Sequence, residues 1–225
     1  MRKIMRFAKG ILYSVILVSI AFSATAQEDS AKNLPNFLLP EFTKCIIKFK
    51  SGAMQTGVVN YNIIDEEFVF QQENNYMVLA DPSVIDTVFV NDRKFIPFKT
   101  GFYELIFTGP VSLFIQHKSN AEPRGAPNAY GTTSQSSNSA YQRQIYGASG
   151  IINLKIPDNF KIVDDSNYWI SKGGSMDKFT NKRQFLKICK TKQKELTEFI
   201  ESKNINFKKF EDVVKLVDYY SGLPG

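Results

Sequence analysis

Few residues in this chain could carry out acid–base or nucleophilic chemistry. His117 is the only histidine, and the two cysteines, Cys45 and Cys189, lie far apart in the sequence. A Ser-His-Asp or Cys-His catalytic group would have to include His117, and no serine lies in a Gly-x-Ser-x-Gly turn. His117 is in register with the apolar residues of a predicted strand at 111–117, so we expect it at the rim of a sheet. One histidine and two distant cysteines give no basis for a zinc site.

Two acidic clusters, Asp65-Glu66-Glu67 and Asp164-Asp165, are the other candidates for catalysis. A glycosidase needs two carboxyl groups held across a sugar, one of them with a raised pKa. The clusters therefore allow an alternative function, a carboxylate-dependent hydrolase that acts on envelope glycans. Adjacent acids in turns are usually solvated, and neither cluster has the alternating acids and glycine of a calcium loop. We assign no catalytic residue, no metal and no cofactor.

Aromatic residues outside the predicted core are better candidates for recognition, because tyrosine and tryptophan offer a large contact area at low entropic cost. Tyr130, Tyr141 and Tyr146 lie in a polar segment, and Trp169 lies beside a predicted hairpin. These four residues are the candidate binding residues. A tryptophan beside a hairpin also commonly packs on the sheet face, which is the alternative for Trp169.

The first 26 residues have the order of a secretory signal peptide. Residues 1–9 carry four basic side chains and no acid, an apolar run follows at 11–22, and Ala24-Thr25-Ala26 is a small-x-small cleavage site. A membrane anchor is the alternative, but the apolar run is too short to cross a bilayer comfortably. We expect a mature chain that begins at Gln27 and resides in the periplasm or at the outer membrane.

Removal of residues 1–26 nearly balances the charge. The whole chain has 28 basic and 22 acidic side chains, and without the first 26 residues 24 basic and 22 acidic ones remain. Nucleic-acid binding loses its electrostatic support, and an envelope protein or glycan is the expected partner. Residues 171–225 keep 12 basic and 7 acidic side chains. This lysine-rich tail could form a peripheral contact with anionic lipid headgroups or lipopolysaccharide, or be the solvated face of helices.

Residues 43–117 predict an antiparallel β domain. Short apolar runs alternate with polar residues and are separated by turn signals, which is typical of a meander that curls into a sandwich or an open barrel. A flexible lead-in at 27–42 precedes it, although its apolar residues 37–40 could pack on a first edge. The predicted strands are 44–50, 54–62, 68–71, 76–79, 84–90, 93–98, 102–107 and 111–117.

The second half of the chain predicts an α+β fold. Residues 118–149 hold six serines and one large aliphatic residue, so we expect a disordered polar loop. Residues 150–225 should form a short strand at 151–156, a hairpin around Lys172-Gly173-Gly174-Ser175 and three short helices, packed on each other or on the same sheet. Asn181 with Gln184 resembles a capping box, and Asn206 is the expected cap of the third helix.

Three phrases of the sequence carry a resemblance: Ser51-Gly52 with Gly57-Val58-Val59-Asn60-Tyr61-Asn62, then Asp92-Arg93-Lys94-Phe95, and finally Leu216-Val217-Asp218-Tyr219-Tyr220. With them the chain resembles a family of uncharacterised secreted proteins of Gram-negative bacteria, in which a strand-rich front half precedes a lysine-rich helical tail. The resemblance covers most of the mature chain. It implies an envelope location and a sheet-plus-helix layout, and it brings no catalytic residues.

These observations favour a non-enzymatic, exported protein of the cell envelope that acts as a macromolecular interaction module. Deletion of residues 118–149 is expected to leave folding intact and to remove a partner. An exposed sheet edge or a flat apolar patch would be the structural mark of such a module.

Overall fold

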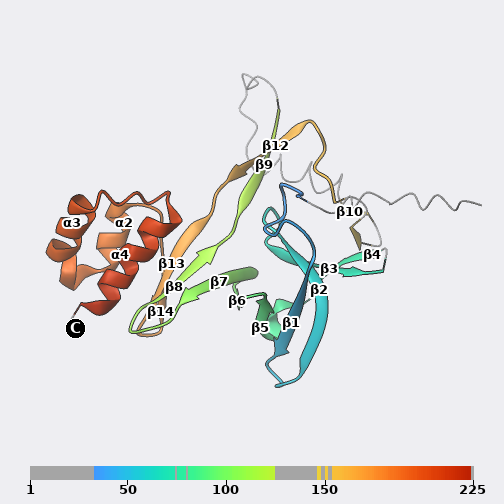
Figure 1. Cartoon of the computed structure of the whole chain (residues 1–225), viewed down its shortest axis with the longest axis horizontal. Coiled ribbons are helices and arrows are strands. Elements are labelled where there is room, and N and C mark those ends of the chain that lie inside the picture. Colours follow the sequence, from blue (N-terminus) through green and yellow to red (C-terminus); the bar gives the residue numbers. More distant parts are fainter. Residues whose placement is uncertain are drawn as a thin grey trace, which may run out of the picture. The chain divides into compact units, whose positions relative to one another are not determined.

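The computed structural model describes residues 33–73, 75–79, 81–124, 146–147, 150–151 and 154–223 of the chain. The alternating apolar residues of the first half form a series of strands, as predicted (Figure 1). A short 3-10 helix, η1 (Pro82–Val84), lies between the fourth and fifth strands. The strands are β1 (Thr43–Phe49), β2 (Met54–Asn62), β3 (Glu67–Gln72), β4 (Asn75–Val78), β5 (Ile85–Val90), β6 (Arg93–Phe98), β7 (Gly101–Phe107) and β8 (Ser112–Gln116).

The second half adds further strands and then the helices, which confirms the predicted α+β class. Three α-helices end the described chain: α2 (Lys182–Ile188), α3 (Gln193–Ser202) and α4 (Phe210–Gly222), with the 3-10 turn η2 (Lys190–Lys192) between the first two. The strands of this half are β9 (Ser119–Pro123), β10 (Tyr146–Gly147), β11 (Gly150–Ile151), β12 (Phe160–Asp164), β13 (Asn167–Lys172) and β14 (Ser175–Phe179).

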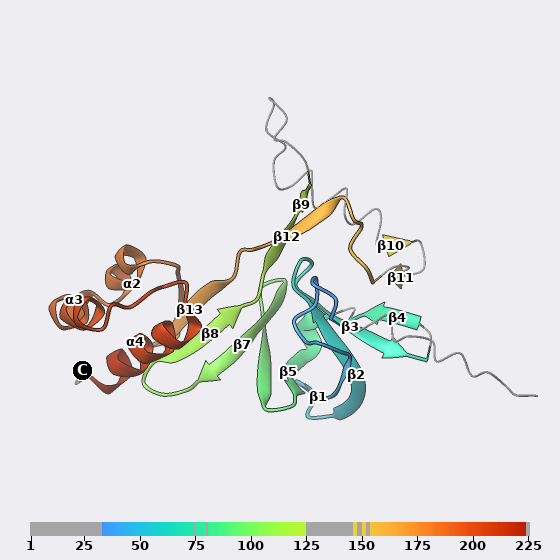
Figure 2. The same ribbon diagram turned by 45° about the horizontal axis from the view of Figure 1, so that its top comes forward.

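The main sheet is open and entirely antiparallel. Its order is β10-β11-β4-β3-β2-β1-β5-β6-β7-β8-β13-β14, so within the described residues β10 and β14 are its two edges. The predicted hairpin β13–β14 joins this sheet through β8, where Ile170 pairs with Leu113. β9 and β12 form a separate two-stranded sheet that continues the chain from β8 and into β13 (Figure 2).

The meander encloses a core built from the inward-facing residues of β1 to β7. Its centre is aromatic: the ring of Phe68 lies 5.0 Å from those of Tyr61 and Phe102, and 5.2 Å from that of Phe95. Gly57 pairs regularly with Cys45 and lies against the ring of Phe70. The buried residues of this core are Leu39, Cys45, Ile47, Val59, Tyr61, Phe68, Ile85, Val88, Val90, Phe95 and Phe102.

A second core, here called the helix core, lies between the three helices and one face of β8, β13 and β14. None of these helices is long enough to be stable alone, so packing on the sheet supplies their stability. Phe179 and Phe185 are fully buried at its centre, with ring centroids 5.1 Å apart. Its buried residues are Val111, Leu113, Ile115, Tyr168, Ile170, Phe179, Phe185, Cys189, Leu196, Ile200, Val213, Leu216, Val217 and Tyr220.

The structure corrects several predicted boundaries. Residues 119–123, expected in the disordered loop, form β9 because their backbone pairs with β12. The strand expected at 151–156 reaches only Ile151 within the described residues, and the next strand is β12. Leu34, Phe37 and Leu39 are buried, so the apolar part of the predicted flexible lead-in is packed: Leu39 joins the meander core, and Leu34 and Phe37 join a separate cluster with Val69, Ala121 and Phe160.

The predicted N-cap residue is confirmed for the first helix and wrong for the third. Asn181 Oδ1 accepts a hydrogen bond from Gln184 N at 3.0 Å, whereas the Gln184 side chain bonds Thr180 rather than completing a capping box. α4 begins at Phe210, and Asn206 instead accepts a bond from Lys208 N at 2.9 Å, in the turn before the helix.

Candidate functional site

Of the four predicted binding residues, the structure describes the surroundings of one. Tyr130 and Tyr141 lie outside the described residues, and of Tyr146 the structure gives only its place in strand β10. Trp169 lies in β13 and is 8% exposed. Its Nε1 donates to Gln116 Oε1 at 3.1 Å, and its ring packs 5.6 Å from Phe98 and 5.3 Å from Tyr103. Trp169 therefore packs on the sheet face, which is the alternative that the sequence left open.

A small hollow of about 300 Å³ lies beside Trp169, and two of the residues that line it have unusual backbone conformations. Glu66 and Lys99 have φ values of 59° and 55°, a region that costs a residue with a Cβ about 1 kcal/mol or more. Their side chains have partners: Glu66 binds Lys118 at 2.8 Å and Gln116 at 2.6 Å, and the Lys99 ammonium lies 4.8 Å above the Trp169 ring. The charged and amide side chains named here therefore interact with one another or with the Trp169 ring.

Acidic side chains of both sequence clusters accept hydrogen bonds from other residues. Glu66, the centre of Asp65-Glu66-Glu67, occupies the turn between β2 and β3 with the partners given above. Asp164 Oδ1 accepts hydrogen bonds from the backbone and hydroxyl of Ser166, at 3.1 and 2.6 Å. The Asp164 bonds are local to a turn, whereas Glu66 ties the β2–β3 turn to Gln116 and Lys118 near the end of β8.

His117, at the end of β8, belongs to a partly buried charged cluster that the sequence does not reveal. Arg93 binds both carboxylate oxygens of Glu104, at 2.7 and 2.6 Å, and His117 Nε2 lies 2.5 Å from Glu104 Oε2. Burial by itself raises the pKa of Glu104, but the hydrogen bonds from Arg93 and His117 outweigh it and lower the pKa to about 2. A carboxyl with this pKa stays ionised at neutral pH and cannot serve as a general acid.

Both cysteines are buried free thiols. Cys45 lies in the meander core and Cys189 in the helix core, so no disulfide joins them. Burial raises the pKa of each thiol to about 11, which removes their nucleophilic character near neutral pH.

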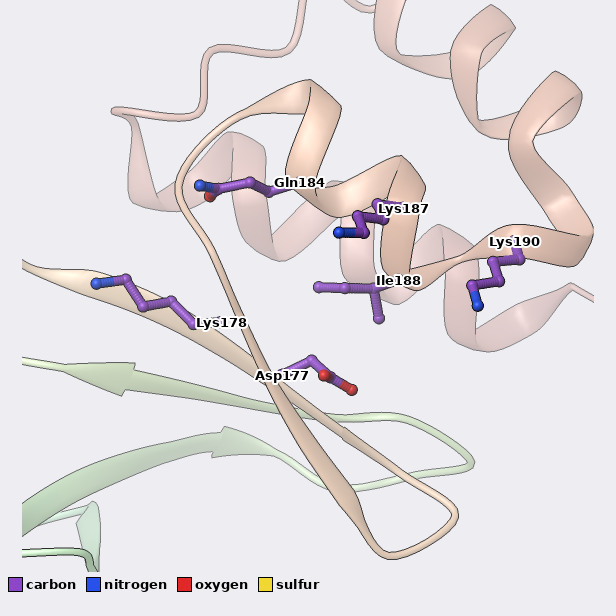
Figure 3. A pocket seen from close by; sticks show the side chains of 6 residues that line it. All are labelled: Asp177, Lys178, Gln184, Lys187, Ile188 and Lys190. Atoms are coloured by element: carbon purple, nitrogen blue, oxygen red, sulfur yellow. The ribbon is translucent and has the colours of Figure 1, made fainter.

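A hollow lined mainly by lysines lies at the end of the sheet. An open hollow of about 680 Å³ lies between β14 and α2, lined by Asp177, Lys178, Gln184, Lys187, Ile188 and Lys190 (Figure 3). We call it the lysine groove. Figure 3 shows the side chains of the α2 segment projecting toward β14.

The lysine groove lies at the edge of the strand rather than over one face. Trp169 pairs with Lys178 and Ile170 pairs with Asp177, and Ile170 belongs to the helix core. Since successive residues of a strand point to opposite faces, Lys178 and Asp177 flank the edge from two sides. A hollow lined by both residues therefore opens onto the backbone of β14, which has no strand on its outer side within the described chain.

The cations of the lysine groove have no partner within the described residues. Lys182, next to it, is neutralised by Glu201 at 2.7 Å, but Lys178, Lys187 and Lys190 form no ion pair there and are exposed. Asp177, the acid that lines the groove, accepts a hydrogen bond from Ser175 Oγ at 3.0 Å. The sequence identified the basic tail but not these three lysines, because only the fold brings β14 beside α2.

Comparisons with models of protein families, with curated proteins and with solved structures found no match to this chain. Within the described part of the chain, no helix combines the length and apolar character needed to cross a membrane. The described residues also contain no group of three or more histidine, cysteine or acidic side chains placed to hold a metal ion.

Proposed function

We propose that this protein is an exported, non-enzymatic module of the cell envelope that binds another macromolecule. The observation that carries the proposal is the backbone edge of β14, which no described strand pairs with, beside lysines that form no ion pair within the described residues. An exposed strand edge is a ready template for an added chain and is uncommon unless it is protected or used. The signal-like order of residues 1–26 supports export.

The partner surface proposed here differs from the polar segment that the sequence favours. Deletion of residues 118–149 would remove β9 as well, and with it the pairing of β9 with β12. A loss of binding in that deletion would not distinguish a lost partner surface from damage to the fold. The lysine groove can be altered through exposed side chains instead.

Site-specific photo-crosslinking in the native cells tests the proposal. A photoreactive residue at Asp177, in the groove, should capture a discrete macromolecule, and the same residue at Lys203, exposed beyond the end of α3, should not. The captured product should disappear when Lys187 and Lys190 are both replaced by glutamate. Equal capture from both positions, or none from Asp177, would contradict the proposal.

A further inference from the structure

We infer that the lysine groove accepts an extended acidic segment of a partner protein, which pairs with β14 as an additional strand of the main sheet. This inference rests on the proposed function and identifies the kind of partner and its mode of binding. Three features of the described residues carry it: the backbone of β14, the charge of the groove and an apolar side chain in it.

The backbone of β14 offers hydrogen-bonding groups at alternate residues. Gly173 and Gly174, with φ values of 57° and 82°, form a two-residue turn between the paired residues Lys172 and Ser175. The pair that flanks such a turn is hydrogen-bonded, and bonded pairs alternate with non-bonded ones along the hairpin. The N–H and C=O groups of Met176 and Lys178 therefore point away from β13, toward the open edge. A polypeptide strand supplies both matching donors and acceptors.

The charge of the groove selects an acidic strand. Lys178 comes from β14 itself, whereas Lys187 of α2 and Lys190 of η2 lie on the other side of the groove. A segment between these two sides would have ammonium groups on both, against one carboxylate, Asp177. Glutamate or aspartate at alternate positions would pair with these lysines. A second copy of β14 would instead bring lysines close to lysines, and like charges repel.

The groove also contains an apolar contact. Ile188 is partly buried and lines the groove between Lys187 and Lys190 (Figure 3). In an added strand the side chains alternate between the two faces, so an apolar residue next to an acid could contact Ile188. This combination of a backbone edge, a basic wall and an apolar contact fits a polypeptide better than the flat anionic surface of a membrane.

A capped seven-residue peptide of alternating glutamate and valine is the probe. Fluorescence anisotropy should show saturable binding to the purified protein, and hydrogen exchange should show new protection at the amides of Met176 and Lys178. The peptide with lysine in place of glutamate should not bind. Two versions of the acidic peptide can carry N-methyl groups on alternate backbone nitrogens. The version whose methyl groups replace the N–H donors that face β14 should lose binding.

Two kinds of variant separate charge from backbone pairing. Lys187→Glu with Lys190→Glu should weaken binding about ten-fold or more, while the matched pair Lys203→Glu with Lys208→Glu, outside the groove, should leave it unchanged. Met176→Pro removes an outward N–H without changing the charge, a substitution that an edge strand tolerates. It should also abolish binding, with Trp169 fluorescence confirming that the variant is folded.

The result that would overturn the inference is distinct from a failure of the proposed function. Absent peptide binding, or binding without protection of Met176 and Lys178, refutes strand addition. If crosslinks from Asp177 then capture a glycan or a folded protein surface, the proposed function stands and the inference fails. If the Lys203 and Lys208 pair weakens binding as much as the groove pair, the attraction is not local and the inference also fails.

Discussion

At the scale of single residues, Glu104 shows how the fold changes the chemistry of an ordinary side chain. It lies in β7, in a sequence with no acidic neighbour, and its side chain is 12% exposed. Arg93 and His117 provide the hydrogen bonds that keep it ionised in this environment. An isolated carboxylate at this depth would be strongly destabilising, so the three residues form one unit that is retained or lost together.

The pKa of Glu104 sets a pH dependence of stability. Because its folded pKa, about 2, lies below the ordinary value of 4.5, its contribution is complete above about pH 4.5 and disappears as the pH falls toward 2. We expect Glu104→Gln to lower the free energy of unfolding by about 3 kcal/mol at pH 7. Urea titrations across this pH range should show the difference from the native protein shrinking in acid.

The matched control for Glu104 is an exposed carboxyl in a similar ion pair. Glu122 binds Lys161 at 3.0 Å with 40% of its side chain exposed. Glu122→Gln should change the free energy of unfolding by less than about 1 kcal/mol at any pH, because exposed ion pairs contribute little. A Glu104 variant with the same pH profile as the native protein would refute this account.

At the scale of elements, the hairpin β13–β14 is the unit that creates the proposed binding edge. β13 pairs with β8 on one side and β14 on the other, and no strand of the described residues pairs with the outer side of β14. The turn at Gly173 and Gly174 sets the register of the hairpin, and that register decides which backbone groups of β14 face outward. The conformation of this turn therefore affects both stability and recognition.

Gly174→Ala tests the turn. The alanine Cβ would meet no atom within 4 Å, so the cost comes from the φ of 82° alone and should be about 1 kcal/mol. Gly222→Ala, in the last turn of α4, is the matched control, because that glycine also has open space and no positive φ. Thermal unfolding should show a lower Tm for the first variant and an unchanged or higher Tm for the second. Equal effects would contradict the proposed cause.

At the scale of the whole molecule, the described residues belong to one compact unit in which the helices depend on the sheet. Tyr168 and Ile170 of β13 and Phe179 of β14 bury their side chains in the helix core. Trp169 lies on the opposite face of β13. Loss of the helix core should therefore disturb both faces of the sheet end. Helix and strand signals are expected to disappear in one transition.

Phe185→Ala measures this coupling. Phe185 is fully buried and packs against Phe179 and Tyr220, so its truncation should cost about 3 to 5 kcal/mol. Trp169 fluorescence and far-ultraviolet circular dichroism should lose signal at the same, lower temperature. Phe210→Ala, at a side chain that is 41% exposed, should leave both transitions nearly unchanged. Two separate transitions for Phe185→Ala would show that the helices unfold independently of the sheet.

Local sequence patterns were enough to locate most of the strands and the three helices. Alternating apolar residues and turn signals located the strands of the meander within a few residues, and the Gly173-Gly174 turn and the N-cap Asn181 were correct. Such features depend on residues within one or two turns of the chain. The basic character of the tail was also visible in the composition.

Which of these residues come into contact depends on long-range pairing in the folded chain. Gln116 pairs with Asn167 although the polar segment lies between them in the sequence, and this pairing leaves β14 as an edge of the sheet. The cluster of Arg93, Glu104 and His117 and the hollow between β14 and α2 also depend on contacts between distant parts of the chain. Periodicity reports which face of an element is buried but not which neighbour covers it, so these sites depend on the fold.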